Sequence, residues 1–78
     1  MSIDRLVLEE EKQVIQDIDI RMPYFRPMMN VYARHPTSNN EYVVTEYLKM
    51  IKQNVGQRHY TVMNHIYEAI RDGKNERW

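Results

Sequence analysis

Apolar residues recur with the period of an α-helix in the middle of the chain. They follow one another at intervals of three or four positions, which places them on one side of a helix, while charged and amide side chains fall on the other. This pattern predicts a helix over about 39–54. The apolar stripe consists of Val44, Leu48, Ile51 and Val55.

Capping signals mark both ends of this predicted helix. Ser38 and Glu41 have the S-x-x-E spacing of a capping box, in which the two side chains satisfy amide groups at the start of a helix. Gly56 follows the stripe, and glycine adopts the left-handed conformation that closes many helices at little cost. We therefore expect Ser38 to be the N-cap and Gly56 to be the left-handed closing residue.

A second helical pattern follows Gly56 almost at once. Apolar residues again lie on one stripe, and Gly73 marks the end of the pattern, which predicts a helix over about 58–72. Because the connection is so short, the two helices should form either an antiparallel hairpin or a sharper helix-turn-helix corner. The stripe consists of Val62, Ile66, Ala69 and Ile70.

The first third of the chain is less regular. Its apolar spacing predicts a helix over about 3–20, ending before Pro23, and Pro27 could open a short helix over about 28–34 as its first residue. Polar and apolar residues alternate from Asp17 to Met22, which is also typical of a half-buried strand. The alternative to an all-helical chain is therefore an α+β fold with a hairpin built from about 14–22 and 28–34.

These patterns together predict an all-α bundle of three to four helices. A chain of 78 residues makes one domain with a thin core, here residues 1–73, followed by a frayed tail at 74–78. The predicted core consists of Val7, Val14, Ile18, Val31, Val44, Leu48, Ile51, Val62, Ile66 and Ile70.

Composition and charge narrow the classes of function. Eleven basic and eleven acidic residues cancel, so the net charge gives no argument for nucleic acid or a membrane. The charges are unevenly spread. The charged residues of segment 1–20 are mainly acidic, and those of segment 21–35 are all arginines, so we expect the two segments to attract each other. No apolar run is long enough to cross a bilayer and no secretory signal is present, which predicts a cytoplasmic protein.

The sequence contains no motif for catalysis, a cofactor or a metal. The chain has no cysteine, which excludes disulfides and thiolate metal sites. Its two glycines are isolated, and His59 and His65 are too far apart in sequence to share a helical face as a metal pair would. We therefore predict a protein without enzymatic activity. Abundant Asn, Ile and Met are typical of low-GC coding, as in many phages.

The stretch from 21 to 35 is the best candidate for a protein interface. Arginine and aromatic residues are enriched at interfaces, so this stretch predicts a small adaptor, regulator or inhibitor of a larger protein, with a homodimer as a further option. The alternative, favoured by the small size of the domain, is that the aromatic residues are core and the arginine stems lie over them. The candidate residues are Arg21, Tyr24, Phe25, Arg26, Tyr32 and Arg34.

A second hypothesis is a small dimeric helix-turn-helix DNA-binding regulator. In that interpretation the helix after Gly56 would enter the major groove. Glu68 and Asp72 lie on the same polar face, and a strongly basic surface is missing, so we favour the protein-interaction hypothesis. The residues that would contact DNA are Arg58, His59, Asn64, His65 and Arg71.

Overall fold

A computed structural model describes the backbone of residues 2–73 and the side chains of residues 11–73. Within this range the chain forms four α-helices and no strand, which confirms the predicted all-α fold. Residues 14–22 and 28–34 belong almost entirely to helices, so the alternative hairpin is wrong. The predicted tail at 74–78 lies outside the described residues. The helices are α1 (Ser2–Arg21), α2 (Phe25–Arg34), α3 (Ser38–Asn54) and α4 (Gln57–Arg71).

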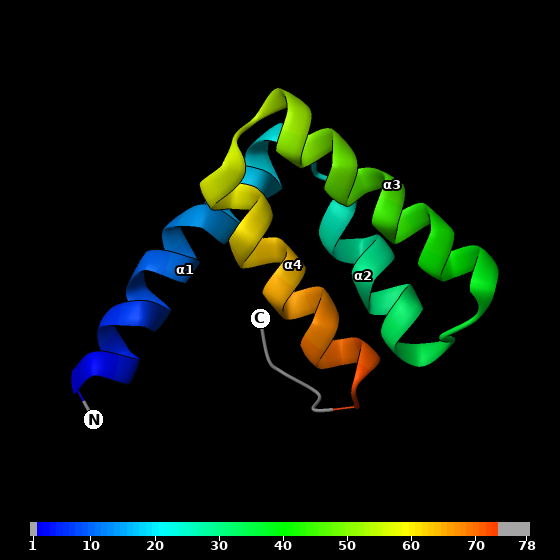
Figure 1. The fold of residues 1–78 in the computed structure, drawn as a ribbon, viewed down its shortest axis with the longest axis horizontal. Helices are drawn as coiled ribbons and strands as arrows, with labels where there is room; N and C mark the ends of the chain where they lie inside the picture. The colour runs from blue at the N-terminus through cyan, green and yellow to red at the C-terminus, as the bar shows by residue number, and fades with distance from the viewer. Residues whose placement is uncertain (1, 74–78) are drawn as a thin grey trace.

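The four helices form a small bundle in which α4 contacts all of the others (Figure 1). Helices α2 and α3 lie side by side, joined by residues 35–37, and α3 meets α4 at a sharp corner. Helix α1 packs against α4 and α2, and its N-terminal half extends away from the other helices. The C-terminal half of α1 therefore carries its contacts with the bundle.

The start of α3 differs from the predicted capping box. Thr37 is the N-cap, in an extended conformation, and its Oγ1 accepts a hydrogen bond from the amide of Asn40 at 3.2 Å. Ser38 is instead the first residue of the helix, so the prediction of Ser38 as N-cap is wrong. Threonine offers the same acceptor as serine one position earlier. The carboxylate of Glu41 is not part of the cap and instead accepts a hydrogen bond from Tyr67 of α4.

Gly56 joins α3 to α4 with very little chain. Its amide donates to the carbonyl of Ile51 at 3.0 Å, and its own carbonyl accepts from the amide of Tyr60 at 3.0 Å. Its φ of 155° is positive, in the region that favours glycine, but its ψ of 166° is not that of a left-handed helical residue, so the predicted closing conformation is wrong in this respect. Glycine suits the position nevertheless, because side chains rarely tolerate this region of positive φ.

Helix α2 begins earlier than the proline pattern indicated. Its first residue is Phe25, so Pro27 is the third residue of the helix rather than the first. Proline is tolerated there because the amides of the first helical turn have no partner within the helix. Helix α2 is therefore ten residues long, and its buried residues are Phe25, Met29 and Tyr32.

The core confirms most of the predicted residues. Val62 and Ile70 are half-buried and pack against it, and the side chain of Val7 lies outside the described residues. The assignment of Val31 to the core is wrong. Val31 is 41% exposed, because Met29 and Tyr32 occupy the inward side of α2. The predicted residues that are buried are Val14, Ile18, Val44, Leu48, Ile51 and Ile66.

Aromatic and methionine side chains complete the core. Phe25 and Met29 are fully buried. Among the described residues, no polar or charged residue is buried. These large side chains fill the space between α2 and the other helices, where the thin aliphatic stripes alone would leave voids. The further buried residues are Ile15, Met22, Tyr32, Met63, Tyr67 and Ala69.

Candidate protein-contact face on α2 and α3

The predicted interface stretch divides between the core and the surface. Phe25 is 0% exposed and Tyr32 is 3% exposed, so neither side chain is open to a partner in this structure. For these two residues the alternative interpretation, that the aromatics are core, agrees with the structure. Tyr24 remains open, with 44% of its side chain exposed, and Arg34 is exposed at the end of α2.

Two of the predicted interface arginines contact acidic residues of α1. The Nε of Arg21 lies 2.9 Å from Oδ2 of Asp17, and Nη2 of Arg26 lies 3.2 Å from Oδ2 of Asp19. These ion pairs agree with the expected attraction between the acidic first segment and the arginines that follow it. Both pairs are substantially exposed, where ion pairs contribute little to stability.

Tyr24 begins a row of apolar side chains along the open side of α2. Met28 and Val31 follow at the spacing that places residues on one side of a helix. Met28 is half-buried against the core and Val31 is open to solvent. We call Tyr24, Met28 and Val31 the open row of α2.

A matching row lies along the adjacent side of α3. The ring centroids of Tyr24 and Tyr47 are 5.0 Å apart and the rings are tilted by 60°, so the two rows meet at this pair. Val43 lies one turn before Tyr47, and Met50, 39% exposed, lies about one turn after it. The row of α3 therefore consists of Val43, Tyr47 and Met50.

The two rows meet at Tyr24 and Tyr47, and we call their six residues the α2–α3 face. The two helices are joined by residues 35–37 and run antiparallel, so Met28 lies at the level of Val43 when Tyr24 is paired with Tyr47. None of the six residues carries a charge. The sequence signal for this face was a second apolar stripe beside the core stripe of α3, which Val43 and Tyr47 display.

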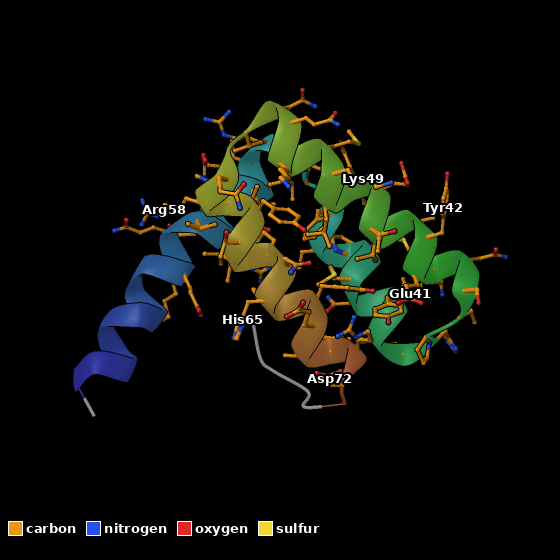
Figure 2. The ribbon with its side chains drawn as sticks, in the orientation of Figure 1. Glu41, Tyr42, Lys49, Arg58, His65 and Asp72 are labelled. Carbon is orange, nitrogen blue, oxygen red and sulfur yellow. The ribbon has the colours of Figure 1, made fainter. Side chains whose placement is uncertain are left out.

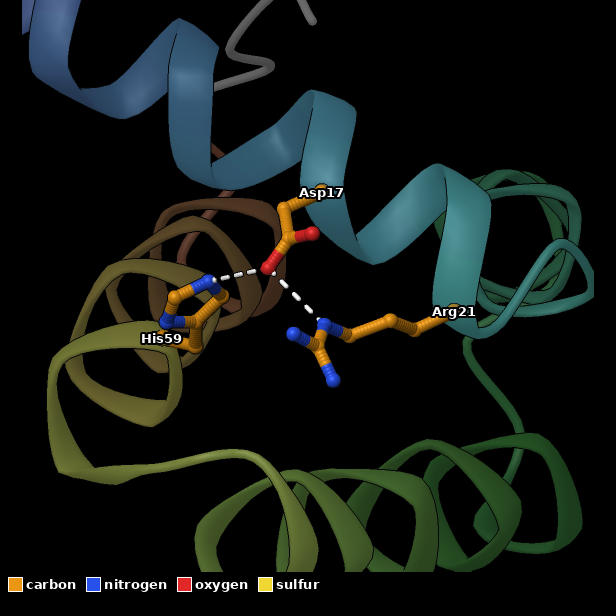
Figure 3. Close-up of polar contacts among 3 residues, drawn as sticks. All are labelled: Asp17, Arg21 and His59. Atoms are coloured by element: carbon orange, nitrogen blue, oxygen red, sulfur yellow. Dashed lines mark hydrogen bonds and ion pairs between the residues drawn. The ribbon is translucent and has the colours of Figure 1, made fainter.

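The residues predicted to contact DNA do not form one basic surface. His59 faces α1: its Nε2 lies 2.8 Å from Oδ2 of Asp17, and its side chain is only 22% exposed (Figure 3). Arg58 and His65 are exposed and point away from the bundle (Figure 2). His59, one of the residues predicted to contact DNA, therefore contacts α1 instead.

The other two predicted DNA contacts have acidic neighbours. The Nδ2 of Asn64 donates to Oε2 of Glu68 at 3.3 Å, and Nε of Arg71 lies 3.5 Å from Oδ1 of Asp72. These carboxylates lie along the same helix and would repel a phosphate backbone. The structure thus adds weight to the electrostatic argument against DNA.

Asp17 connects α1 to α4 through its carboxylate. The same Oδ2 atom accepts from Arg21 and lies against His59 (Figure 3). The hydrogen bond from Arg21, and then the one from His59, lowers the pKa of Asp17 below its ordinary value. This cluster joins residues far apart in sequence, and we interpret it as a tie between helices.

A second polar tie joins α3 to α4. The hydroxyl of Tyr67 donates to Oε2 of Glu41 at 2.6 Å, and Glu41 lies at the end of the bundle where α3 begins (Figure 2). Burial, and then this hydrogen bond, raises the pKa of Tyr67 to about 12. The ring of Tyr67 also stacks on Tyr32, with centroids 5.7 Å apart. The sequence pattern did not indicate this tie, because Glu41 also has the spacing of a capping box with Ser38.

Comparisons with known proteins identify no relative. No protein-family model matches the chain, and no curated protein or solved structure is significantly similar to it. Among the described side chains, no group of three His, Asp or Glu residues is placed to hold a metal ion. No helix of the described chain has the length and apolarity that a membrane span requires.

Proposed function

We propose that the chain is a non-enzymatic protein-interaction module, an adaptor, regulator or inhibitor, that binds another protein through the α2–α3 face. The observation that carries this proposal is the run of uncharged aromatic, methionine and valine side chains along two adjacent helices. Tyr24, Val31 and Met50 remain 44%, 41% and 39% exposed there. Interface centres are depleted of charge and enriched in tyrosine and methionine, as this face is.

The proposed α2–α3 face overlaps only in part with the interface predicted from the sequence. Of the six residues predicted from the sequence, Tyr24 belongs to this face, while Phe25 and Tyr32 contribute to the core beneath it. Arg21 and Arg26 are occupied with acids of α1. A partner would therefore contact mainly apolar side chains, and its binding should depend little on salt.

The DNA-binding alternative has less support. It relies on a polar face of α4 where His59 contacts Asp17 and where Glu68 and Asp72 add negative charge. A cytoplasmic location stays a prediction from the sequence, and the proposal does not depend on it.

Site-specific photo-crosslinking in the cells from which the gene comes tests the proposal. The photoreactive amino acid benzoylphenylalanine replaces Met50 or, in a second variant, Val31. The control position is Gln53, which is exposed on the same helix as Met50 but outside the face. We expect the probes at Met50 and Val31 to give the same adduct with another protein, and the probe at Gln53 to give none.

Two results would contradict the proposal. One is the absence of any protein adduct from Met50 and Val31. The other is an adduct that forms equally well from Gln53, since that would show a contact unrelated to the α2–α3 face. Circular dichroism of each variant confirms that it keeps the helical content of the wild type.

A further inference from the structure

We infer that the N-terminal half of α1, residues 2–11, is a second protein-contact element that binds an apolar groove rimmed by lysine or arginine on another protein. This inference goes beyond the proposed function, because these residues lie outside the α2–α3 face and require a partner of opposite charge. It is carried by the course of α1, by the side of α1 that the bundle buries and by the acidic residues on that side.

Helix α1 continues as one helix beyond the bundle. It runs unbroken from Ser2 to Arg21, and its N-terminal half extends away from the other helices (Figure 1). Its C-terminal half is anchored in the core, where Val14 is 2% exposed and Ile18 is 0% exposed. Helices shorter than about 12 residues are marginal in water by themselves. The N-terminal half is therefore the extension of a helix that the anchored half stabilises.

The side of α1 that the bundle buries continues into this N-terminal half. At 3.6 residues per turn, positions 3 and 7 lie on the same side of the helix as Val14 and Ile18. Ile3 and Val7 occupy these positions, and Leu6 lies about one turn from Ile3. One apolar stripe therefore begins in the core and continues along the part of α1 that leaves the bundle. Its burial in the C-terminal half distinguishes this stripe from the outer side of the helix.

Two glutamates on this stripe have no basic neighbour along α1. Glu10 and Glu11 lie about one turn before Val14 and share its side of the helix. No lysine or arginine stands three or four positions from either of them, whereas Glu9 stands four positions after Arg5. The helix dipole does not account for the two glutamates, because its effect is confined to the first turn. Any cation that neutralises them therefore comes from outside α1.

Glu11 is half-buried without an ion pair. Its side chain lies on the side of α1 that also buries Val14, whereas the neighbouring Lys12 is exposed. It forms no ion pair with any described residue, while Asp17 and Asp19 in the C-terminal half each lie within 3.2 Å of a basic side chain on another helix. A partly desolvated carboxylate without a cation is unfavourable. A partner that covers the stripe therefore gains free energy if it supplies a cation.

These features define the groove that would accept the N-terminal half of α1. A groove that covers Ile3 and Val7 also lies against Glu10 and Glu11, because the four positions share one side of the helix. Its floor should therefore be apolar, and its rim should carry lysine or arginine. Residues 2–11 hold four acidic residues and one basic residue, so positive charge on the partner also steers the approach of the two proteins.

Charge disfavours two other occupants of the stripe. Nucleic acid would bring its phosphates against the glutamates. A second copy of the chain that paired its own stripe with this one would place the acidic residues of both copies in one interface, where like charges repel. The partner that the stripe fits best is therefore a different, basic protein surface.

Site-specific photo-crosslinking of the full chain, in the cells from which the gene comes, tests this inference. Benzoylphenylalanine replaces Val7 on the stripe, and a control probe replaces Lys12, which is exposed on the other side of α1. Two further variants combine the Val7 probe with a charge reversal. Glu10→Lys reverses a charge on the stripe, and Glu9→Lys makes the same change away from it. Mass spectrometry identifies the peptide that each probe contacts.

We expect the Val7 probe to give an adduct with another protein, in a contacting peptide that carries lysine or arginine, and the Lys12 probe to give none. The yield from Val7 should fall about tenfold for Glu10→Lys and change less than about twofold for Glu9→Lys, because only Glu10 lies against the basic rim. Crosslinking in the lysate at high ionic strength should also lower the yield, because salt screens the attraction.

The inference is overturned if the Val7 probe gives no adduct, or an adduct that Glu10→Lys leaves unchanged. An adduct that forms equally well from Lys12 has the same consequence. A crosslink within one chain to residues 74–78, or a crosslink to a second copy, also overturns it, since either would show that this protein covers its own stripe.

Circular dichroism verifies that each variant keeps the helical content of the wild type. Where Glu10→Lys lowers that content, Glu10→Gln removes the charge without reversing it, and Glu9→Gln is its matched control. Failure of this inference is distinguishable from failure of the proposed function, because the probes at Met50 and Val31 report on the α2–α3 face and the probe at Val7 reports on α1.

Discussion

Helix α2 carries two rows of large apolar side chains that differ in exposure rather than in chemistry. The interior row consists of Phe25, Met29 and Tyr32, which are at most 3% exposed. The open row consists of Tyr24, Met28 and Val31, and each of its members is the sequence neighbour of an interior one.

The comparison shows why residue type alone could not separate core from interface in this segment. Adjacent residues on a helix point about 100° apart, so one aromatic of a pair can be buried while its neighbour faces solvent. Tyr24 and Phe25 are such a pair, at 44% and 0% exposed. The interior row should therefore determine stability, and the open row should determine binding.

The largest expected effect separates the two rows directly. Phe25→Ala removes a fully buried ring and should lower the free energy of unfolding by about 3–5 kcal/mol, which leaves little of a domain this small folded. Tyr24→Ala should cost less than about 1 kcal/mol, because its ring is partly solvated already. Urea unfolding followed by circular dichroism measures both. Phe25→Leu provides a milder change, and equal losses in the two rows would refute the division.

The interior row ends at a tyrosine pair whose polar contact should have a smaller effect. Tyr67→Phe keeps the ring stacked near Tyr32 but removes the hydroxyl that donates to Glu41. The free energy of unfolding should fall by about 1–2 kcal/mol, because a partly buried hydrogen bond to a carboxylate is lost. In the variant Glu41→Ala, the further change Tyr67→Phe should have a much weaker effect, and an undiminished one would argue against the contact.

The same hydroxyl predicts a dependence of stability on alkaline pH. Burial and the hydrogen bond to Glu41 raise the pKa of Tyr67 from its ordinary value of 10.0 to about 12, so the unfolded chain loses this proton more readily than the folded one. The contribution of the protonated Tyr67 hydroxyl to the free energy of unfolding is then fully present below about pH 10 and is lost as the pH rises toward 12. Unfolding curves between pH 9 and 12 should show a steeper loss for wild type than for Tyr67→Phe, and parallel curves would contradict the raised pKa.

The smallest expected effect on stability comes from oxidation of the open surface. Met50 is 39% exposed, whereas Met29 and Met63 are almost completely buried, so dilute hydrogen peroxide should convert Met50 to its sulfoxide before either of them. Because the added oxygen can remain in water, the free energy of unfolding should change by less than about 0.5 kcal/mol. Peptide mass spectrometry measures the order of oxidation. Early oxidation of Met29 would show that the interior row opens to solvent.

The helix boundaries show how far local patterns reached. The apolar stripe predicted the bounds of α3 to within a residue or two, because the 3.6-residue repeat of a helix involves only residues that are close in sequence. The choice between Thr37 and Ser38 as the cap was not decided by that repeat, since both side chains offer the same oxygen. In the structure Thr37 is the cap, and the carboxylate of Glu41 accepts a hydrogen bond from Tyr67 of α4, a helix that begins sixteen positions later, at Gln57.

The candidate face shows where local patterns end. The notion that the 21–35 segment carries contact residues came from its composition, and Tyr24 remains one of them. Met28, Val31, Val43, Tyr47 and Met50 were missed as contact residues, because a row becomes a surface only when two helices bring their rows together. The pairing of Tyr24 with Tyr47 is such a contact, and no spacing within either helix specifies it.

The all-helical class and most of the aliphatic core follow from the amino-acid sequence, because both depend on the period of apolar residues within single helices. The exposure of Val31, the burial of Phe25, the Asp17–His59 tie and the α2–α3 face depend on the tertiary structure. Each results from how one helix is rotated and placed against another. That placement is set by side-chain packing across elements, to which positions far apart in the chain contribute together.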